Sequence, residues 1–549
     1  MKLSTGVPIG LIILIFTTTL FSGCTREIST QEFTNTQEVI DIPQNWWNGS
    51  VFYQIFVRSF YDSDGDGIGD LQGIIQKLDY LNDGNPNTTT DLGIKGIWLL
   101  PIHPSPSYHG YDVTDYYSIN PDYGTLDDFK ELISETHKRG ICIIIDFVMN
   151  HTSEEHPWFQ QAMDKESSYH DWYIWSDENP GYLGPWGEVV WHRIFSDGYY
   201  YGVFYSGMPD LNYRNPQVGE EMRRIAKFWL ADVGVDGFRV DGARHLIENG
   251  ETQANTAETH AWFKDFHEYV RSINTEALIV GEVWDSVFAA AKYVKEDEFD
   301  LVFDFELASA IIKGVGSGNA GKITDAITYN FGIYPLGETV PFLTNHDMDR
   351  VMSQFGRDEE KTRVAAAIFL TLPGTPFIYY GEEIGMVGTK PDEYIRTPMQ
   401  WTNSNNSGFT TGTPWIEVKD DYPDKNVELL SQRDSSLLND YKNLIHLRNS
   451  FPGLQYGNVL VVKSNHSSIY SIFHVWNDQL ILLVINLDYQ KVDEVVLSVD
   501  NGLPDGDFIL SPIFGSSEDI TLTVDDSGGF KEIKITDLEP YETLIFSSE

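Results

Sequence analysis

The 549-residue chain has little cysteine and few positive charges. Its two cysteines, Cys24 and Cys142, are too few for a disulfide framework. Lysine and arginine number 37 against 82 aspartate and glutamate, which gives a formal net charge of −45. This balance argues against nucleic acid and anionic membrane surfaces as partners, because both repel a strongly acidic protein. It is compatible with a neutral substrate, with cation binding or with a salty medium, and composition does not choose among them.

Long hydrophobic runs are also scarce, and one stands at the N-terminus. Residues 7–16 are apolar after Lys2, and this run is short for a membrane span, so residues 1–24 are predicted to be a secretory signal peptide. Ser22-Gly23-Cys24 resembles a bacterial lipobox, in which the cysteine is acylated after cleavage. The alternatives are an ordinary signal peptide and an uncleaved anchor. We therefore expect an extracellular or cell-surface protein, anchored through Cys24 and a polar tether at 25–45.

From residue 46 onwards, buried strands alternate with amphipathic helices. The chain is 41% hydrophobic, enough for a large core. The near-continuous apolar run 141–148 is typical of a strand covered on both faces. The expected strands are 51–58, 94–102, 141–148, a strand that contains Arg239 and Asp241, 277–283, 301–305, 340–344 and 375–380. Eight strands, each followed by helical sequence, predict an α/β fold, a (β/α)8 barrel formed by 46–151 and 213–451.

Two segments depart from this alternation. Residues 152–212 are rich in Trp, Tyr, Gly and His without a clear period, and a structureless loop of that length is implausible. We predict a subdomain inserted after the third strand. Residues 452–549 contain short alternating strands with Gly, Asp and Asn turns, which predict a C-terminal antiparallel β-sandwich. Without a charged constellation, this domain is expected to be structural or to contact carbohydrate.

Charged residues lie at the C-terminal ends of several predicted strands. Arg239 and Asp241 are two apart, so they project from one face of a strand, and the guanidinium favours the ionised acid. A barrel gathers its strand ends into one pocket, where Asp241, Glu282 and Asp347 would repel one another and raise at least one pKa. One ionised and one protonated carboxyl is the requirement for glycoside cleavage. For each residue alone, the alternative is a structural ion pair or a strand-end cap.

Four sequence blocks carry a family resemblance. They are Asp146-Phe-Val-Met-Asn-His151, Gly237-Phe-Arg-Val-Asp-Gly-Ala-Arg-His245, Gly281-Glu-Val-Trp284 and Phe342-Leu-Thr-Asn-His-Asp347. In order and position they resemble the blocks of the α-amylase family of glycoside hydrolases, and the resemblance extends from about residue 46 to the end. It implies a retaining mechanism with Asp241 as nucleophile, Glu282 as general acid/base and Asp347 as the acid that grips sugar hydroxyls.

The same resemblance implies a set of sugar-binding residues. These are Tyr111, Asp112, His151, Arg239, His346 and Arg396. Tyr111 corresponds to an aromatic platform beneath the sugar, and the two histidines to side chains around it. Asp112 and Arg396 correspond to a pair that closes the non-reducing side.

An acidic loop follows the first predicted strand. Asp62, Asp64, Asp66, the backbone carbonyl of Ile68 and later Asp70 have the spacing of calcium ligands, although Gly73 replaces the bidentate Glu of an EF-hand. Oligo-1,6-glucosidase-like family members bind calcium through a loop of this form, so Ca²⁺ is the expected cofactor. The alternative is a solvated acidic turn.

The segments 208–212 and 242–243 indicate the subfamily. They resemble the lipoprotein α-amylases intermediate between the oligo-1,6-glucosidase and neopullulanase subfamilies. The expected activity is cleavage of internal α-1,4-glucosidic bonds in starch and maltooligosaccharides. The enzymatic alternatives are an exo-acting α-glucosidase or oligo-1,6-glucosidase and a neopullulanase-like enzyme. The non-enzymatic ones are an amylase-like transporter heavy chain and a glucan-binding lipoprotein.

Overall fold

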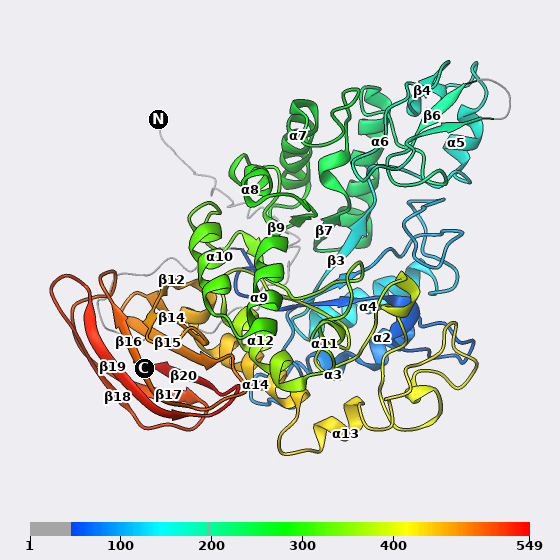
Figure 1. The fold of residues 1–549 in the computed structure, drawn as a ribbon. Helices are drawn as coiled ribbons and strands as arrows, with labels where there is room; N and C mark the ends of the chain where they lie inside the picture. Colours follow the sequence, from blue (N-terminus) through cyan, green and yellow to red (C-terminus); the bar gives the residue numbers. More distant parts are fainter. Residues whose placement is uncertain (1–44, 195–197, 549) are drawn as a thin grey trace, which may run out of the picture.

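The structure is a computed structural model that describes residues 45–194 and 198–548. The predicted signal peptide, lipobox cysteine Cys24 and nearly all of the tether lie outside the described residues. Within the described ranges, every helix is too short or too polar to cross a bilayer. The chain forms a central barrel, an extension built from the segment after β3, and a separate β-domain that carries the C-terminus (Figure 1).

Eight parallel strands form the barrel. They are β1 (Phe52–Ile55), β2 (Gly96–Leu99), β3 (Cys142–Phe147), β7 (Gly237–Val240), β8 (Leu278–Gly281), β9 (Leu301–Phe303), β10 (Thr339–Val340) and β11 (Phe377–Tyr379). Their order is β10-β9-β8-β7-β3-β2-β1-β11. The sheet closes because the Thr375 and Phe377 amides donate to the Thr339 and Pro341 carbonyls, each at 3.0 Å. The predicted (β/α)8 barrel is confirmed.

Helices between the strands cover the outside of the barrel (Figure 1). The longer ones are α4 (Leu126–Lys138), α6 (Pro216–Lys227), α7 (Ala257–Ile273), α8 (Val287–Lys295), α9 (Phe305–Ser317), α10 (Gly321–Phe331), α12 (Glu359–Thr371) and α14 (Leu437–Ser450). In α4 the Thr125 hydroxyl accepts the Asp128 amide, and the Asp128 carboxylate accepts the Thr125 amide. This capping box satisfies donors that the first turn leaves free.

The strands are shorter than predicted at their C-terminal ends. Residues 51–58 were expected to be one strand, but Val57–Phe60 form the short helix α1. Residues 341–344 likewise leave the sheet after β10. Both segments are buried and follow the strand without a glycine, so the sequence does not mark where the strand ends. At this end of the barrel the chain turns away to build the loops around the central cavity.

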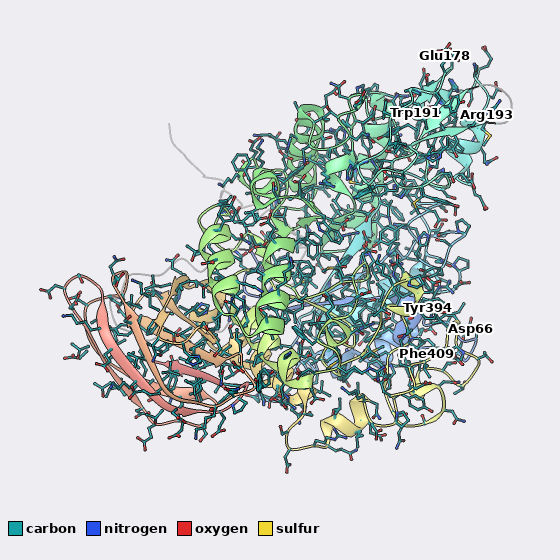
Figure 2. The ribbon with its side chains drawn as sticks, viewed as in Figure 1. Asp66, Glu178, Trp191, Arg193, Tyr394 and Phe409 are labelled. Atoms are coloured by element: carbon teal, nitrogen blue, oxygen red, sulfur yellow. The ribbon has the colours of Figure 1, made fainter. Side chains whose placement is uncertain are left out.

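The segment after β3 forms a small subdomain of its own. It contains α5 (Pro157–Ala162) and a sheet of order β4-β6-β5, with bounds Trp175–Ser176, Tyr199–Tyr201 and Trp191–Arg193. Aromatic packing replaces a larger core, since Phe159 contacts both Trp175 and Tyr200 with ring centroids 5.8 and 5.1 Å apart. Figure 2 places Trp191 and Arg193 at the outer end of the molecule.

The C-terminal strands form two packed antiparallel sheets. One has the order β12-β14-β15-β20-β17-β18 and the other β13-β16-β19. The bounds are Asn458–Val461 (β12), Lys463–Ser464 (β13), Ile469–Trp476 (β14), Gln479–Asn486 (β15), Val492–Val499 (β16), Gly506–Phe514 (β17), Ile520–Val524 (β18), Phe530–Leu538 (β19) and Thr543–Ser547 (β20). A second buried apolar cluster, including Phe473, Leu497 and Phe546, lies between the sheets. The expected fold class is confirmed, while the domain boundaries at 46, 152, 213 and 452 stay a prediction.

A buried arginine of α14 joins the barrel to the segments around it. Arg448 is fully buried, and its guanidinium donates to five backbone carbonyls. They belong to Gly49 (3.3 Å), Leu370 (3.1 Å), Leu372 (2.6 Å), Gly374 (2.6 Å) and Leu454 (2.8 Å). One side chain therefore provides hydrogen-bond donors for backbone carbonyls at the end of α12, before β11 and before β1.

We expect Arg448→Met to lower the free energy of unfolding by about 3 kcal/mol or more, because it leaves buried carbonyls without donors. The matched control is Arg433→Met, which removes an exposed arginine near the same helix and is expected to change stability by less than about 0.5 kcal/mol. Thermal unfolding of both variants in a calorimeter measures the difference. Equal midpoints for the two variants would contradict this role for Arg448.

Candidate active site

A cavity of about 970 Å³ lies at the C-terminal ends of the barrel strands. Its lining residues come from the strand ends, the inserted subdomain and the segment after β11. They are His109, Tyr111, His151, Trp186, Phe204, Tyr205, Met208, Asp241, Gly242, Arg244, His245, Glu282, Trp284, Asp347, Lys390, Asp392 and Arg396. The barrel therefore brings Asp241, Glu282 and Asp347 to one cavity, as their positions after predicted strands indicated.

Arg239 is the common contact of three carboxylates. Its Nη1 lies 2.8 Å from Oδ1 of Asp146 and 2.7 Å from Oδ1 of Asp241, and its Nη2 lies 2.7 Å from Oε2 of Glu282. The guanidinium is fully buried and packs 5.0 Å from the Trp98 ring centroid. Arg239 and Asp241 touch because the two-residue period of β7 directs both side chains to one side.

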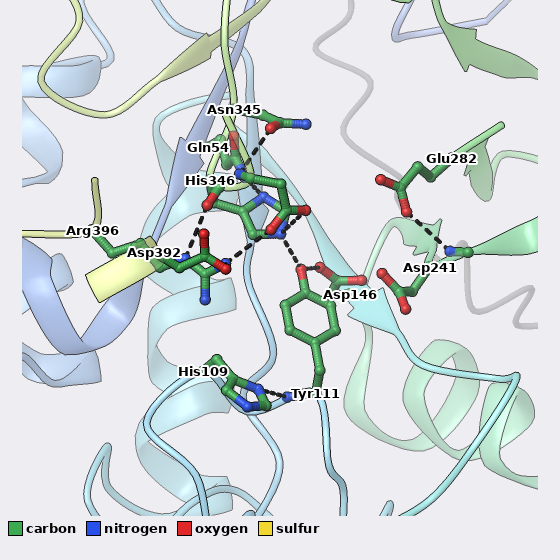
Figure 3. A network of polar contacts seen from close by, with 12 residues as sticks. Gln54, His109, Tyr111, Asp146, Asp241, Glu282, Asn345, His346, Asp392 and Arg396 are labelled. Carbon is green, nitrogen blue, oxygen red and sulfur yellow. Dashed lines mark hydrogen bonds and ion pairs between the residues drawn. The ribbon is translucent and has the colours of Figure 1, made fainter. Parts of the chain in front are cut away.

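Glu282 is fixed close to Asp241 by the backbone as well. The Gly242 amide donates to Glu282 Oε2 at 3.0 Å, as Figure 3 shows beside the Asp241 carboxylate. Gly242 has φ of +50°, a left-handed conformation that costs a residue without Cβ little. A Cβ at this position would also meet the Phe204 ring at 2.7 Å. Glycine here lets the chain turn between the two acids and beneath the subdomain.

Burial raises the pKa of Asp241 to about 7 and that of Glu282 to about 7, while the Arg239 guanidinium acts against the rise in both. Burial also raises the pKa of Asp146 to about 6. Our expectation that Arg239 keeps the Asp241 pKa low is therefore not met, since loss of hydration outweighs the charge pair. Two nearby acids repel each other when both are charged, so the second proton leaves the pair less readily than the first.

A second network surrounds His346. Gln54 Nε2 donates to His346 Nδ1 at 2.8 Å, which leaves the proton on Nε2. Nε2 contacts the Tyr111 hydroxyl at 2.5 Å and Asp347 Oδ2 at 3.0 Å, and Tyr111 in turn donates to Asp146 Oδ2 at 2.9 Å. Burial holds the pKa of His346 well below its usual value, so the ring is neutral. The network orients Asp347 and the Tyr111 ring toward the cavity.

Arg396 fixes the other oxygen of Asp347. Its Nη2 lies 2.9 Å from Asp347 Oδ1 and 3.3 Å from Asp392 Oδ2, and its Nε donates to the His346 carbonyl at 2.9 Å. Figure 3 places Arg396 and Asp392 on the side of the site opposite Glu282. Charged side chains therefore line this end of the cavity.

Asp112 Oδ1 lies 3.9 Å from Nδ1 of His109, which lines the cavity. It accepts hydrogen bonds from the Ser105 and Ser107 hydroxyls, and in the described part of the chain it forms no ion pair with Arg396. Arg396 instead contacts Asp392, a residue that was not predicted from the sequence. His151 lines the cavity, and its Nε2 lies 3.1 Å from the Tyr111 carbonyl.

Several wall residues were missed from the sequence. Trp186, Phe204 and Tyr205 come from the inserted subdomain, and the Trp186 ring lies 5.7 Å from Phe204 and 5.2 Å from His245. The only available signal was the aromatic richness of residues 152–212, which does not say which rings face the barrel.

The acidic loop after β1 brings part of its predicted ligand set together. Side-chain oxygens of Asp62, Asp64 and Asp70 lie within 4.8 Å of one another. Asp66 stands outside this cluster, and its Oδ1 accepts the Ile68 amide at 2.8 Å. Asp70 also caps helix α2 (Leu71–Gln76) by accepting the Gly73 amide at 2.6 Å. Three clustered carboxylates with oxygen chemistry fit Ca²⁺, which Asp62, Asp64 and Asp70 would hold with the Ile68 carbonyl.

The loop packs against the segment that follows Arg396. The Asp62 amide donates to the Phe409 carbonyl at 3.1 Å, the Trp415 amide to the Gly67 carbonyl at 2.9 Å, and Figure 2 shows Asp66 and Phe409 in the same region. Trp415 Nε1 bonds Ser59 at 3.0 Å, and Ser59 donates to the Arg396 carbonyl at 2.5 Å. The acidic loop and a cavity arginine are thus joined by hydrogen bonds.

Comparisons with known proteins agree with this geometry. The family description "Alpha amylase, catalytic domain" matches residues 54–457. Alpha-amylase 3 of Dictyoglomus thermophilum is 42% identical over 450 residues, covering 81% of this chain and 85% of that protein. Oligo-1,6-glucosidase of Bacillus cereus is 34% identical over 529 residues, covering 82% and 92%. The crystal structure of alpha-amylase from H. orenii superposes with a TM-score of 0.80 at 43% identity, over 91% of this chain and 99% of that one. The chain belongs to the alpha-amylase family of glycoside hydrolases.

Proposed function

We propose that the protein cleaves internal α-1,4-glucosidic bonds of starch and maltooligosaccharides with retention of anomeric configuration. The observation that carries this proposal is the pair Asp241 and Glu282, two largely buried carboxylates that contact the same guanidinium and line the cavity. A retaining hydrolase needs one ionised and one protonated carboxyl on either side of the scissile bond. The similarity to proteins named alpha-amylase, at 42% and 43% identity, exceeds the 34% to an oligo-1,6-glucosidase.

In the first step, ionised Asp241 attacks the anomeric carbon as the glycosidic C–O bond breaks, and Glu282 gives its proton to the departing oxygen. In the second step, Glu282 takes a proton from water, whose oxygen attacks the same carbon and releases Asp241. Both residues return to their starting state. The Gly242 amide and Arg239 support the negative charge that Glu282 acquires between the steps.

Sugar binding is assigned to the second network. Asp347 is 31% exposed and faces the cavity, with its two oxygens held by Arg396 and His346. A carboxylate fixed in this way accepts hydrogen bonds from two neighbouring hydroxyls. Tyr111, stacked 5.5 Å from the His346 ring, offers an apolar face to a sugar ring. Wrong placement of either group costs rate, because catalysis depends on orientation.

The exo-acting and 1,6-specific alternatives are supported by the charged end formed by Arg396 and Asp392, which would stop a chain that continues past the first sugar. Endo cleavage is favoured by the size of the cavity, about 970 Å³, and by its aromatic walls. Because the chain is an α-amylase-type enzyme, the two non-enzymatic alternatives, a transporter heavy chain and a glucan-binding lipoprotein, are not supported. We further propose an extracellular or cell-surface location with a lipid anchor at Cys24.

Ca²⁺ is proposed as a structural ion of the 62–70 loop. Asp62 already accepts the amides of Gly65 and Gly67 at 2.7 and 2.8 Å, so the loop is folded around its carboxylates. When bound, the ion offsets the repulsion among these acids. It lies in the loop after β1 and takes no part in bond cleavage.

Product analysis distinguishes the specificities. We expect soluble starch to give mixed oligosaccharides early and in the α-anomeric form, and pullulan to be a poor substrate. Glucose alone would indicate exo action, and panose from pullulan a neopullulanase-like enzyme.

Asp241→Asn should lower kcat by at least about 1,000-fold, because it removes the nucleophile. The exposed Asp526→Asn serves as control and should leave kcat unchanged.

The pH profile of kcat/KM tests the shared proton. Activity requires ionised Asp241, lost as pH falls, and protonated Glu282, lost as pH rises. The two pKa values of about 7 predict a bell centred near neutrality, with each limb falling about tenfold per pH unit. Asp146→Asn removes a negative neighbour of Asp241 and should move the acidic limb to lower pH. An optimum below about pH 5 in the wild type would contradict this account.

Calcium removal is expected to lower the thermal midpoint, and added Ca²⁺ to restore it. At a concentration 100 times Kd the ion stabilises by about 2.7 kcal/mol. Asp64→Asn should weaken the response because it removes one of three clustered carboxylates, whereas Asp526→Asn should keep it. Calorimetry with and without chelator, with the bound metal measured by elemental analysis, checks both. A metal-free wild type with an unchanged midpoint in chelator would refute the assignment.

A further inference from the structure

A second cavity, of about 670 Å³, adjoins the catalytic one. It is bounded by the loop after β8 and by helices α9 and α10, which lie side by side next to α8 (Figure 1). We call it the α9–α10 groove. Its lining residues are Trp284, Asp285, Phe305, Glu306, Ser309, Ala310, Lys313, Lys322, Asp325, Ala326, Tyr329 and Asn330. Trp284 lines both cavities, so the groove continues the space in which Glu282 lies.

Two aromatic side chains lie exposed in the groove. The Trp284 ring stacks on Phe305 with centroids 4.5 Å apart and planes 6° from parallel, which fixes its orientation, and it remains 48% exposed. Tyr329 on α10 is 56% exposed. Leaving such rings in water forgoes the free energy of burying apolar area, so they indicate a ligand with apolar faces.

The polar groups between these rings fit a neutral ligand. The lining contains two basic residues, Lys313 and Lys322, and three acidic ones, Asp285, Glu306 and Asp325, so the charges nearly balance. Among the described residues, the side chains of Ser309, Lys313 and Asp325 have no hydrogen-bond or ion-pair partner. Free donors and acceptors beside exposed rings match a polyhydroxylated sugar chain better than an anion or a purely apolar peptide.

The direction of the groove follows from the two ends of the site. Glu282, the proposed donor to the leaving oxygen, comes two residues before Trp284, while Arg396 and Asp392 lie on the opposite side of the site (Figure 3). Sugar units on the leaving-group side of the cut therefore extend past Trp284 toward α9 and α10.

We propose that the α9–α10 groove binds the reducing-end stretch of a long α-glucan whose scissile bond lies at Asp241 and Glu282. This inference rests on the proposed function, since it takes the substrate to be a glucan. It assigns Tyr329 as a binding residue that acts on long chains and leaves short ones unaffected.

Tyr329→Ala tests the groove. For amylose we expect KM to rise about 3- to 10-fold with little change in kcat, because one stacking surface is lost. For maltotriose, which does not reach α10, both constants should stay within about twofold of wild type. Tyr329→Phe keeps the ring and should behave as wild type. As a control, Tyr489→Ala removes a tyrosine of the C-terminal domain that is 71% exposed. It should leave KM and kcat unchanged for both substrates.

The cleavage pattern of maltoheptaose labelled at its reducing end gives a second readout. Wild type should release longer labelled fragments than Tyr329→Ala, because the groove holds units on the labelled side. Equal patterns and an equal ratio of amylose to maltotriose kcat/KM in both proteins would overturn the inference, and the groove would then serve another partner. If the wild type cuts neither substrate, the proposed function itself fails.

Discussion

One guanidinium among three carboxylates is the constraint on which the site depends. Arg239 is fully buried and contacts Asp146, Asp241 and Glu282, which come from β3, the end of β7 and the end of β8. Without the cation, three acids could not remain together in a space withdrawn from water. With it, the cluster still carries more negative than positive charge, and the pKa values of the acids rise. Arg239 therefore links three barrel strands and also influences the pKa values of the two proposed catalytic acids.

The barrel could be predicted because its strands are continuous apolar runs. Residues 142–147 are fully buried, and no alternative to a strand covered on both faces fits Ile143-Ile-Ile145. Strand ends were harder to predict. Val57–Phe60 follow β1 without a glycine or proline and are as buried as the strand, yet they form a helix, so the sequence does not mark where β1 ends. In the C-terminal domain, β19 is hard to recognise from the sequence, since its exposed positions carry Lys, Glu and Asp and the alternation is irregular.

The catalytic carboxylates could also be placed from the sequence, since a barrel brings strand ends together whatever the loops do. The walls of the cavity could not. Trp186 and Phe204 lie in a segment without periodicity, and only the packing of the small subdomain directs them to the barrel. The contact between Arg396 and Asp392 was not predicted for a similar reason: Ser105 and Ser107 donate to Asp112 locally, and the sequence does not indicate which acid the arginine will contact. The pKa of Asp241 depends on hydration, which a sequence pattern does not report.

The hydrogen bonds between the acidic loop and the segment after β11 have a consequence for regulation. Trp415 bonds both Gly67 and Ser59, and Ser59 bonds the carbonyl of Arg396, whose side chain grips Asp347. Whatever orders residues 62–70 thus also restrains the arginine that faces the sugar. By thermodynamic reciprocity, any factor by which an ion in this loop changes the affinity for a ligand in the cavity equals the factor by which that ligand changes the affinity for the ion.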